Sequence, residues 1–582
     1  MVVRKTKIVA TLGPATEHPD MVFKLLQAGV NMVRLNLSHG SHEEHRRRIE
    51  AVREASRRLG RPVAIMVDLQ GPEIRIGTFR GGRILLREGD RFTLTTRPCE
   101  GDQERVWVQY PDIVRDVPVG GRLLLDDGNI VLQAVAVTDT EIETRVLVGG
   151  VLSDRKKVNL PGTKVSLPAL SDKDLEDIRF AVEMNVDYVA GSFIRKAQDV
   201  LDIRRVIEEL GGQQAIISKV ETQEGYDNLD AILEVSDGLM VARGDLGVEV
   251  PAEEVPLMQK AMIRRANEMG KPVITATQML ESMVTKPRPT RAEASDVANA
   301  IMDGTDAVML SAESATGQYP LEAVRTMASI ALRTEAALDY RAMLQRTVPR
   351  DTVTEAVCHG TVATAADLGA AAIVSATKSG FTARMVAKYR PFCPIIAVTP
   401  DEAVARKLTL VWGVTPVVKP EADNTDALID RAVEGALESG LVKSGDLVVI
   451  TAGLPVGVSG ATNMIKVQMV ADVLARGSGI GRGGVSGMAR VVRSEADLDR
   501  VQRGDILVAR CTNEAFVPAM ERAAGIIAEE GGLSSHAAVV GLSLGKPVIV
   551  GAEGILSRIS DGMVITLDVE RGTVYRGEVK VR

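Results

Sequence analysis

Residues 187–193 read DYVAGSF, and similar segments recur as 214–220 QAIISKV, 238–244 GLMVARG, 272–278 PVITATQ and 306–312 DAVMLSA. Each is a short apolar run rich in β-branched residues, and a stretch with helical periodicity follows it. Strands that alternate with helices in this way predict a parallel sheet whose strands are buried on both faces.

Three earlier segments extend this series to eight strand–helix units: 7–13 KIVATLG, 31–37 NMVRLNL and 63–69 VAIMVDL. Eight consecutive units predict an α/β fold of the (β/α)8 TIM barrel type. Active residues of such barrels lie where strands end and loops begin.

The series is interrupted after the third strand. Segments such as RVWVQY and NIVLQAVAV alternate apolar and polar residues between Gly, Pro and Asp turns, which predicts an inserted all-β domain. A second α/β series, with strands AAIVSAT, PIIAVT, TPVVK and DLVVIT, comes after the barrel, and the glycine-rich stretch 476–484 reads as a flexible linker to a last domain. We therefore expect the barrel over 1–69 and 168–337, the β domain over 70–167, an α/β domain over 338–473 and an extra α/β domain over 474–582.

Composition limits the classes of function. The chain has 582 residues, 45% hydrophobic and 25% charged, as in soluble globular proteins, and its net charge of -7 provides no general attraction to nucleic acid or to an anionic membrane. The four cysteines form no CxxC pair, and no signal peptide or long apolar segment is visible. We expect a cytoplasmic protein without nucleic-acid or membrane partners.

Polar and charged residues follow nearly every predicted barrel strand, and we expect them to lie on one face of the barrel. A single such residue often only caps a loop, but the whole set favours a functional site. The set comprises Arg34, Asn36, Ser38, His39, Asp68, Arg195, Lys196, Lys219, Glu221, Arg243, Gly244, Asp245 and Thr277.

The residue types indicate phosphate chemistry. Glu221 and Asp245 are carboxylates on adjacent strands, which suits one hard divalent cation such as Mg²⁺ that also takes substrate oxygens. Asn36, Ser38 and Asp68 add oxygens without a second strong acid, which suggests a weaker monovalent site. Positive charge against a phosphorylated substrate would come from Arg34, Arg75, Lys196 and Lys219.

We interpret two other motifs as structural rather than functional. His39, His42 and His45 invite a transition-metal interpretation, but Ser41 and Glu44 form a capping box that places His42 and His45 on the first turn of an exposed helix. The linker also contains GxGxxG at Gly479, Gly481 and Gly484, yet no strand precedes it and no clear helix follows, so we do not interpret it as a nucleotide site.

The ordered motifs resemble those of the pyruvate kinases. They read KIVATLGPAT, MVRLNLSHG, DLQGPEIR, GSFIRKAQDV, SKVETQEG, VARGDLGVE, ATQMLESM and RPTRAEASDVANAIMDGTDAVMLSAESATGQYP, and they cover residues 5–320. The resemblance implies a barrel with a β lid domain and an α/β effector domain. It also implies transfer of a phosphoryl group from phosphoenolpyruvate to ADP, giving pyruvate and ATP, with Mg²⁺ (or Mn²⁺) and K⁺ as cofactors, in a homotetramer.

Residue roles carried over from the resemblance mostly coincide with the strand-end set. Arg34 would contact the substrate phosphate, and Lys219 would stabilise the transferring phosphoryl group. Gly244, Asp245 and Thr277 would form the region that binds the substrate carboxylate and from which the proton is delivered. Glu221 and Asp245 would bind magnesium. Potassium would be held by Asn36, Ser38, Asp68 and the carbonyl of Leu69, and ADP or ATP by Asn36, Leu37, Ser38, His39, Arg75 and Lys196.

Residues 68–72 depart from the common pattern of the family, because DLQGP replaces DTKGP. Since the potassium contact at the second position is expected through a backbone carbonyl, Leu69 need not abolish the site. Glu73, in the same motif, is the acid that accompanies potassium dependence in the family.

Two further segments carry expectations about regulation. The loop with Thr377, Lys378, Ser379, Gly380 and Thr382 offers hydroxyls and amides for a phosphate, and its place matches the family's effector loop, so a sugar phosphate or AMP is expected there. A helix N-cap by Ser379 is the alternative.

The tail EEGGLSSHAAVVGLSLGKPVIVG (529–551) resembles the phosphohistidine domain of phosphoenolpyruvate-utilising enzymes, and some bacterial pyruvate kinases carry such an extra domain. We expect a structural or regulatory role for it. A phosphate carried by His536, as in a dikinase, is the rival hypothesis, and a non-catalytic effector sensor is a second rival.

Overall fold

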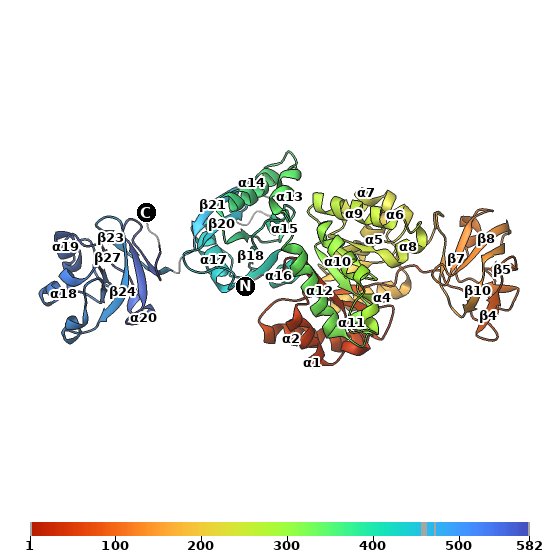
Figure 1. Ribbon diagram of the computed structural model, residues 1–582, viewed down its shortest axis with the longest axis horizontal. Coiled ribbons are helices and arrows are strands. Elements are labelled where there is room, and N and C mark those ends of the chain that lie inside the picture. Colours follow the sequence, from red (N-terminus) through yellow and green to blue (C-terminus); the bar gives the residue numbers. More distant parts are fainter. Residues whose placement is uncertain (1–2, 455–461, 471–472, 580–582) are drawn as a thin grey trace. The chain divides into compact units, whose positions relative to one another are not determined.

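The computed structural model describes residues 3–454, 462–470 and 473–579 (Figure 1). The chain divides into two compact units. The first contains the residues up to 346 with 383–390 and 401–416, and the second contains 347–382, 391–400 and the residues from 417 onward. Within the described ranges, no helix is both long and apolar enough to cross a bilayer.

Eight parallel strands close into the predicted barrel, and each lies within its predicted segment. The closed barrel confirms the fold class. Its strands are β1 (Lys7–Thr11), β2 (Met32–Asn36), β3 (Ala64–Asp68), β12 (Tyr188–Gly191), β13 (Ala215–Val220), β14 (Gly238–Ala242), β15 (Val273–Ala276) and β16 (Ala307–Leu310).

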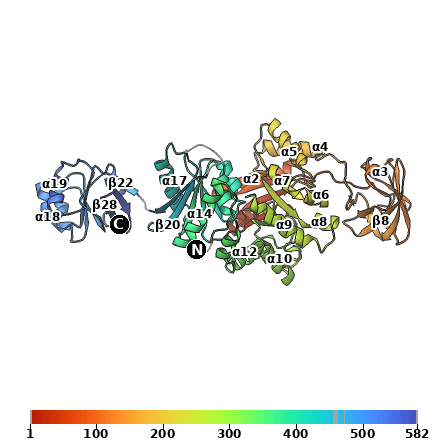
Figure 2. The same ribbon diagram turned by 90° about the horizontal axis from the view of Figure 1, so that it is seen from above.

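Helices pack around the strands (Figure 2), and buried aliphatic side chains such as Leu25, Ile49 and Val297 fill the space between the two layers. The helices are α1 (Pro19–Ala28), α2 (His42–Leu59), α4 (Asp172–Glu183), α5 (Ala197–Glu209), α6 (Gln223–Asp227), α7 (Leu229–Val235), α8 (Arg243–Glu249), α9 (Val255–Glu268), α10 (Arg291–Met302), α11 (Ala312–Ala315), α12 (Pro320–Glu335) and α13 (Tyr340–Arg346). The 3-10 helices η1 (Pro14–Thr16) and η2 (Glu281–Val284) lie in loops.

The first turn of α2 confirms the capping box but corrects the expected exposure. Ser41 Oγ accepts from the Glu44 amide, and Glu44 Oε2 accepts from the Ser41 amide. His45 is buried, not exposed, because its ring turns inward and its Nε2 lies 2.8 Å from the carbonyl oxygen of His39. His42 Nε2 lies 2.6 Å from Asp177 Oδ1. No group of three or more His, Cys, Asp or Glu side chains in the described parts of the chain is arranged to hold a metal.

The segment between β3 and α4 forms two antiparallel-rich sheets around its own core, which includes Phe92, Leu123 and Ile142. It also contains one helix that the sequence did not predict, the four-residue α3 (Ile113–Asp116). The strands are β4 (Arg83–Leu86), β5 (Arg91–Thr95), β6 (Arg105–Trp107), β7 (Arg122–Leu125), β8 (Ile130–Val137), β9 (Glu141–Val148), β10 (Gly150–Ser153) and β11 (Val158–Asn159).

A five-stranded sheet follows the barrel, in the order β19-β18-β17-β20-β21, with β21 antiparallel to β20. The strands are β17 (Ala372–Ala376), β18 (Ile395–Thr399), β19 (Val414–Val418), β20 (Leu447–Ala452) and β21 (Met464–Met469). The helices are α14 (Val353–Leu368), α15 (Phe381–Ala387), α16 (Glu402–Leu408) and α17 (Thr425–Glu438).

The final residues build an eight-stranded sheet, and this corrects the expected flexible linker. Residues 476–484 contribute β23 and the start of β24, and their glycines permit close packing: a Cβ on Gly479 would lie 1.8 Å from the Val569 carbonyl oxygen. The strands are β22 (Val473–Arg476), β23 (Ser478–Ile480), β24 (Gly484–Val492), β25 (Ile506–Ala509), β26 (Gly525–Ala528), β27 (Val548–Val550), β28 (Val564–Asp568) and β29 (Thr573–Arg576). Helices η3 (Glu495–Arg500), η4 (Glu514–Phe516), α18 (Val517–Arg522), α19 (His536–Ser543) and α20 (Ile555–Arg558) join them.

A buried ion pair stabilises the first unit. Arg390 Nη1 donates to Asp306 Oδ1 at 2.9 Å, and both side chains are almost fully buried. Asp306 also accepts from the backbone amides of Val273 and Trp412. Removing one partner of such a pair leaves an uncompensated buried charge, which typically costs about 3–5 kcal/mol.

We predict that Arg390→Met lowers the free energy of unfolding of this unit by about that amount, as measured by urea unfolding followed by circular dichroism. Arg264→Met, which removes an exposed arginine from α9, is the matched control and should behave as wild type. Equal unfolding midpoints for both variants and the wild type would show that the pair contributes no net stability.

Candidate active site

The carboxyl ends of the barrel strands bring four charged side chains together. Arg34 lies on β2, Asp68 ends β3, Lys219 lies on β13, and Glu221 directly follows that strand. The register of β2 against β3 pairs Asn36 with Asp68, so two of the predicted potassium residues are neighbours. The strand-end rule therefore located a real cluster of charges.

Asp68 is the centre of this cluster. Its Oδ2 accepts from Arg34 Nε at 2.7 Å and lies 2.6 Å from Arg34 Nη2, while its Oδ1 lies 3.3 Å from Lys219 Nζ. Burial alone would raise the pKa of Asp68, but the two cations outweigh burial and hold it below its usual value. Asp68 is therefore an anion that fixes two cations inside the barrel mouth.

Lys219 lies between two carboxylates. Its Nζ is 3.3 Å from Asp68 Oδ1 and 3.2 Å from Glu221 Oε1, and it donates to Ser192 Oγ at 2.7 Å. Burial would lower the pKa of Lys219, but Asp68 and Glu221 together raise it well above its usual value. The ammonium is thus fully charged, buried and fixed in direction before any substrate arrives.

Glu221 is completely buried and offers an oxygen for a cation. Its Oε2 accepts from the Phe193 amide at 2.7 Å, whereas its Oε1 lies 3.2 Å from Lys219 Nζ but forms no hydrogen bond of good geometry with any residue that the structure describes. Burial, reinforced by Asp245 and opposed by Lys219, raises the pKa of Glu221 to about 7. A buried carboxylate with an unsatisfied oxygen beside a second carboxylate fits a divalent cation.

Asp245, the second predicted magnesium ligand, is paired with a lysine that the sequence did not single out. Lys157 Nζ, from the inserted β domain, lies 2.6 Å from Asp245 Oδ1 and 3.8 Å from Glu73 Oε1, and it packs over the Phe193 ring. Burial would raise the pKa of Asp245, but Lys157 outweighs burial and lowers it. The Lys157 ammonium is therefore bound to the Asp245 carboxylate. This contact supports the prediction that Asp245 binds a cation.

Thr277 lies on strained backbone beside Gly244. Its φ is +65°, unusual for a β-branched residue, and its Oγ1 accepts from the Gly244 amide at 2.9 Å. Arg243 supports this turn, because it donates to the carbonyl oxygen of Thr277 and pairs with Asp296 at 2.6 Å. Arg243 is therefore a supporting residue rather than a free cation, and Gly244, Asp245 and Thr277 form one contiguous surface.

The predicted potassium oxygens are adjacent. Asn36 Oδ1 accepts from the Ser38 amide at 3.2 Å, and the Leu69 carbonyl oxygen accepts from Ser192 Oγ at 2.8 Å. Ser192, whose hydroxyl oxygen also accepts the hydrogen bond from Lys219 Nζ, was missed by the sequence analysis although it directly follows β12. Carbonyl, hydroxyl and carboxylate oxygens in one loop cluster fit a monovalent cation, with the backbone oxygen of Leu69 independent of its side chain.

The predicted nucleotide residues are less closely connected. Arg75 pairs with Glu73 at 2.6 Å and donates to the Arg155 carbonyl oxygen at 2.9 Å. Lys196 is exposed at the start of α5, where its amide is bonded to Asp199. The structure brings Lys157 to the site and leaves Lys196 at the surface, and the role of Lys196 stays a prediction.

The second unit contains the other predicted sites. Lys378 pairs with Glu421 at 2.8 Å, Gly380 has a φ of +77°, and the hydroxyl of the buried Thr382 lies 2.9 Å from that of Thr462. The helix α15 begins at Phe381, so residues 377–380 form the loop at its start.

His536 begins α19, where its Nδ1 lies 2.8 Å from Thr512 Oγ1. This contact fixes the orientation of the ring. No role of His536 follows from the contact alone.

A TIM barrel whose mouth carries a buried lysine between carboxylates, two adjacent carboxylates for a divalent cation and an arginine is the site of a phosphotransferase. Comparison with known families identifies which one. Residues 3–324 match the pyruvate kinase barrel domain, 355–468 the pyruvate kinase alpha/beta domain, and 501–572 the mobile domain of PEP-utilising enzymes. The chain belongs to the pyruvate kinase family.

Individual relatives agree over the full length. The chain is 55% identical to the pyruvate kinase of Geobacillus stearothermophilus, with 99% of this chain and 100% of the relative covered. It is 50% identical, over 99% of this chain and all of each relative, to the pyruvate kinases of Staphylococcus epidermidis and Staphylococcus aureus.

Lys219→Met should lower kcat by roughly 10²–10³-fold or more, because it removes a charge that acts mainly in the transition state. Binding of phosphoenolpyruvate, measured by calorimetry, should change little. Lys219→Arg keeps the charge and is the matched control. Loss of substrate binding with unchanged turnover per bound substrate would contradict the role assigned to Lys219.

Proposed function

We propose that this pyruvate kinase transfers the phosphoryl group from phosphoenolpyruvate to ADP through the buried charge cluster at the barrel mouth. The observation that carries the proposal is the position of the Lys219 ammonium, within 3.3 Å of Asp68 and 3.2 Å of Glu221. Two carboxylates hold it charged in a largely buried position, where fixed charges act more strongly on a developing charge than they do in water.

Each residue has one task in this proposal. Arg34, aligned by Asp68, binds the phosphate of the substrate, and Lys219 faces the phosphoryl group as its bond to the enol oxygen breaks. The surface of Gly244 and Thr277 holds the substrate carboxylate, and the enolate is protonated in that region. The steps rely on fixed charges rather than on a covalent nucleophile.

Metals complete the charge balance. Glu221 and Asp245 would hold magnesium, which supplies positive charge to the phosphoryl oxygens when it is bound. Asn36, Ser38, Asp68 and the Leu69 carbonyl would hold potassium, and Arg75 with residues 36–39 and Lys196 would contact the nucleotide. Magnesium held by Asp245 would compete with Lys157 for that carboxylate, and Lys157, which comes from the lid, would then be available to an anionic ligand.

A coupled assay for pyruvate tests the proposed reaction directly. ATP and pyruvate should form in equal amounts from phosphoenolpyruvate and ADP. Formation of AMP instead would support the dikinase-like rival, and absence of turnover with retained effector binding would support the non-catalytic sensor.

We predict potassium dependence from Glu73 and the oxygen cluster around Asp68. In buffer free of sodium and potassium ions, activity should be low, and it should rise when potassium chloride is added. Glu73→Lys replaces an acid by a cation and should reduce this dependence through charge balance. Full wild-type activity without any monovalent metal ion would be incompatible with the site.

The loop 377–382 is proposed to bind a phosphorylated effector such as AMP or a sugar phosphate, in the assembly expected from the family resemblance, a homotetramer. Thr377→Ala combined with Ser379→Ala should weaken activation by AMP and by a sugar phosphate while maximal turnover stays near wild type, because the loop is not part of the barrel mouth. The readout is the substrate concentration at half-maximal rate. Unchanged activation in the double variant would eliminate the site.

For the extra domain we propose a structural or regulatory role. A phosphate relay through His536 needs a second active site that loads the histidine, and the barrel chemistry requires none. We predict that His536→Ala keeps essentially full kinase activity. Stoichiometric phosphate on His536 after incubation with phosphoenolpyruvate, detected by mass spectrometry, together with an inactive variant, would refute this role.

A further inference from the structure

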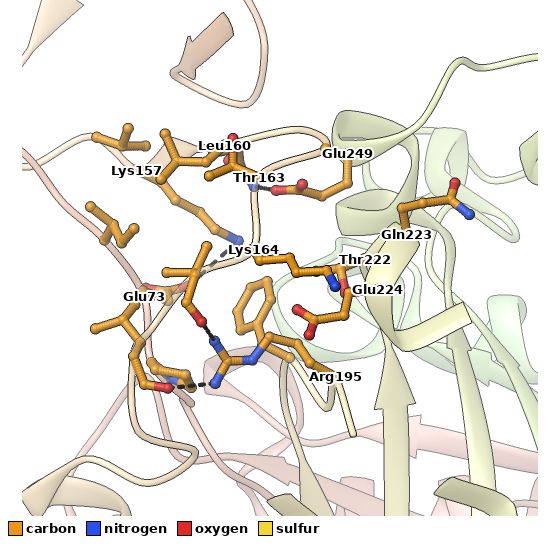
Figure 3. Close-up of a pocket in the computed structure, with 18 of the residues that line it drawn as sticks. Glu73, Lys157, Leu160, Thr163, Lys164, Arg195, Thr222, Gln223, Glu224 and Glu249 are labelled. Carbon is orange, nitrogen blue, oxygen red and sulfur yellow. Dashed lines mark hydrogen bonds and ion pairs between the residues drawn. The ribbon is translucent and has the colours of Figure 1, made fainter. Parts of the chain in front are cut away.

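A pocket of about 230 Å³ lies between the β domain and the loops after β12 and β13, and it shares Glu73 and Lys157 with the surroundings of the active site. Its walls come from Pro72 to Ile74, from 157–167, from Phe193 and Arg195, from 222–228 and from Glu249. In Figure 3 the pocket opens among these side chains, with Gln223 pointing away from it. Sites for drug-sized ligands usually measure about 300–1,000 Å³, so this pocket suits a compact ligand.

One end of the pocket is formed by Asn159 and Glu249. Asn159 Nδ2 donates to Glu249 Oε1 at 2.7 Å, and this contact fixes the orientation of the amide, since only its NH₂ group can donate to a carboxylate. Asn159 is 4% exposed, and its Oδ1 has no hydrogen-bond partner in the ranges that the structure describes. This oxygen is enclosed, so a ligand in the pocket would meet the carboxylate of Glu249 rather than the amide oxygen.

The cations around the pocket are mostly engaged elsewhere. Lys157 pairs with Asp245 at 2.6 Å, and Arg195 donates to the carbonyl oxygens of Val165 and Leu167 at 2.7 and 2.6 Å. Lys164 is exposed at the rim. Burial raises the pKa of Glu249 and the charge of Lys157 opposes this shift, but among the described residues no cation forms an ion pair with the Glu249 carboxylate.

The remaining wall is apolar. Ile74 and Leu160 are buried, and Phe193 presents its ring, with Val158 and Leu167 completing this side. A ligand that satisfies both walls has hydrogen-bond donors and a positive charge at one end and a flat or branched apolar body at the other.

We propose that this hinge pocket is a binding site for a compact organic cation, whose ammonium or amidinium group donates to the carboxylate of Glu249 while its apolar body packs on Phe193, Ile74 and Leu160. The site belongs to both the lid and the barrel. Asn159 lies on β11 of the lid, and Glu249 ends α8, the helix whose first turn contains Asp245. Occupancy of the pocket therefore stabilises one position of the lid relative to the magnesium carboxylates.

Benzamidine is the probe, with benzamide as its neutral isostere and benzoate as the anionic counterpart. The full chain is titrated with each by calorimetry. Benzamidine should bind saturably and at least about tenfold more tightly than benzamide, the preference expected for a charge-assisted hydrogen bond, and benzoate should bind more weakly still. Hydrogen–deuterium exchange should slow in 157–167 and 222–228 on addition of benzamidine.

Glu249→Gln removes the charge but can still accept from Asn159, so it should reduce the preference for benzamidine over benzamide to near unity. Glu253→Gln makes the same change at an exposed position nearby and should keep the preference. Thr163→Phe places a ring in the pocket and should abolish binding of both probes even if Glu249→Gln folds poorly.

Three results would overturn the proposal. They are equal binding of benzamidine and benzamide to the wild type, an unchanged preference for benzamidine in Glu249→Gln, and exchange protection that is confined to other segments. The kinase activity of each preparation is measured in parallel. The experiments can therefore contradict the proposed pocket without contradicting the proposed phosphoryl-transfer site, and the reverse is also true.

Discussion

The ion pairs of Asp68 with Arg34 and Lys219 are the constraint on which the rest of the site depends. Buried charges are costly unless each has a partner, and Asp68 is almost completely enclosed. With Glu221 on its other side, Lys219 keeps its charge in spite of burial. The barrel thus fixes the direction of its positive charge during folding rather than during the reaction, and no reorganisation is needed when negative charge develops on the substrate.

The lid is connected to this cluster through one short helix. At the start of α8, Asp245 contacts Lys157, and at its end Glu249 contacts Asn159, at 2.6 and 2.7 Å. Lys157 and Asn159 are two residues apart in the lid, so the lid contacts both ends of a seven-residue helix. A metal at Asp245 or a ligand beside Glu249 would change one of these two contacts. The proposed metal site and the proposed hinge pocket would therefore both act on the lid through α8.

The sequence predicted the eight barrel strands because buried parallel strands are continuous β-branched runs, and it predicted Lys219, Glu221 and Asp245 because strand ends converge in a barrel. It missed Lys157, which reaches the site from an inserted strand with no strand-end signal. It also misread Gly479, since glycine composition cannot distinguish a flexible segment from a strand packed too closely for a Cβ. His45 was misplaced because a capping box defines where a helix starts and not which face is buried.

The most direct test of the account is a crystal structure of the full chain grown with Mn²⁺ and phosphoenolpyruvate, in which anomalous scattering locates the metal. We predict a manganese peak bound by the carboxylates of Glu221 and Asp245, with Lys157 no longer in contact with Asp245 and Lys219 still between Asp68 and Glu221. A peak at another position, or Lys157 still paired with Asp245 beside a bound metal, would contradict it.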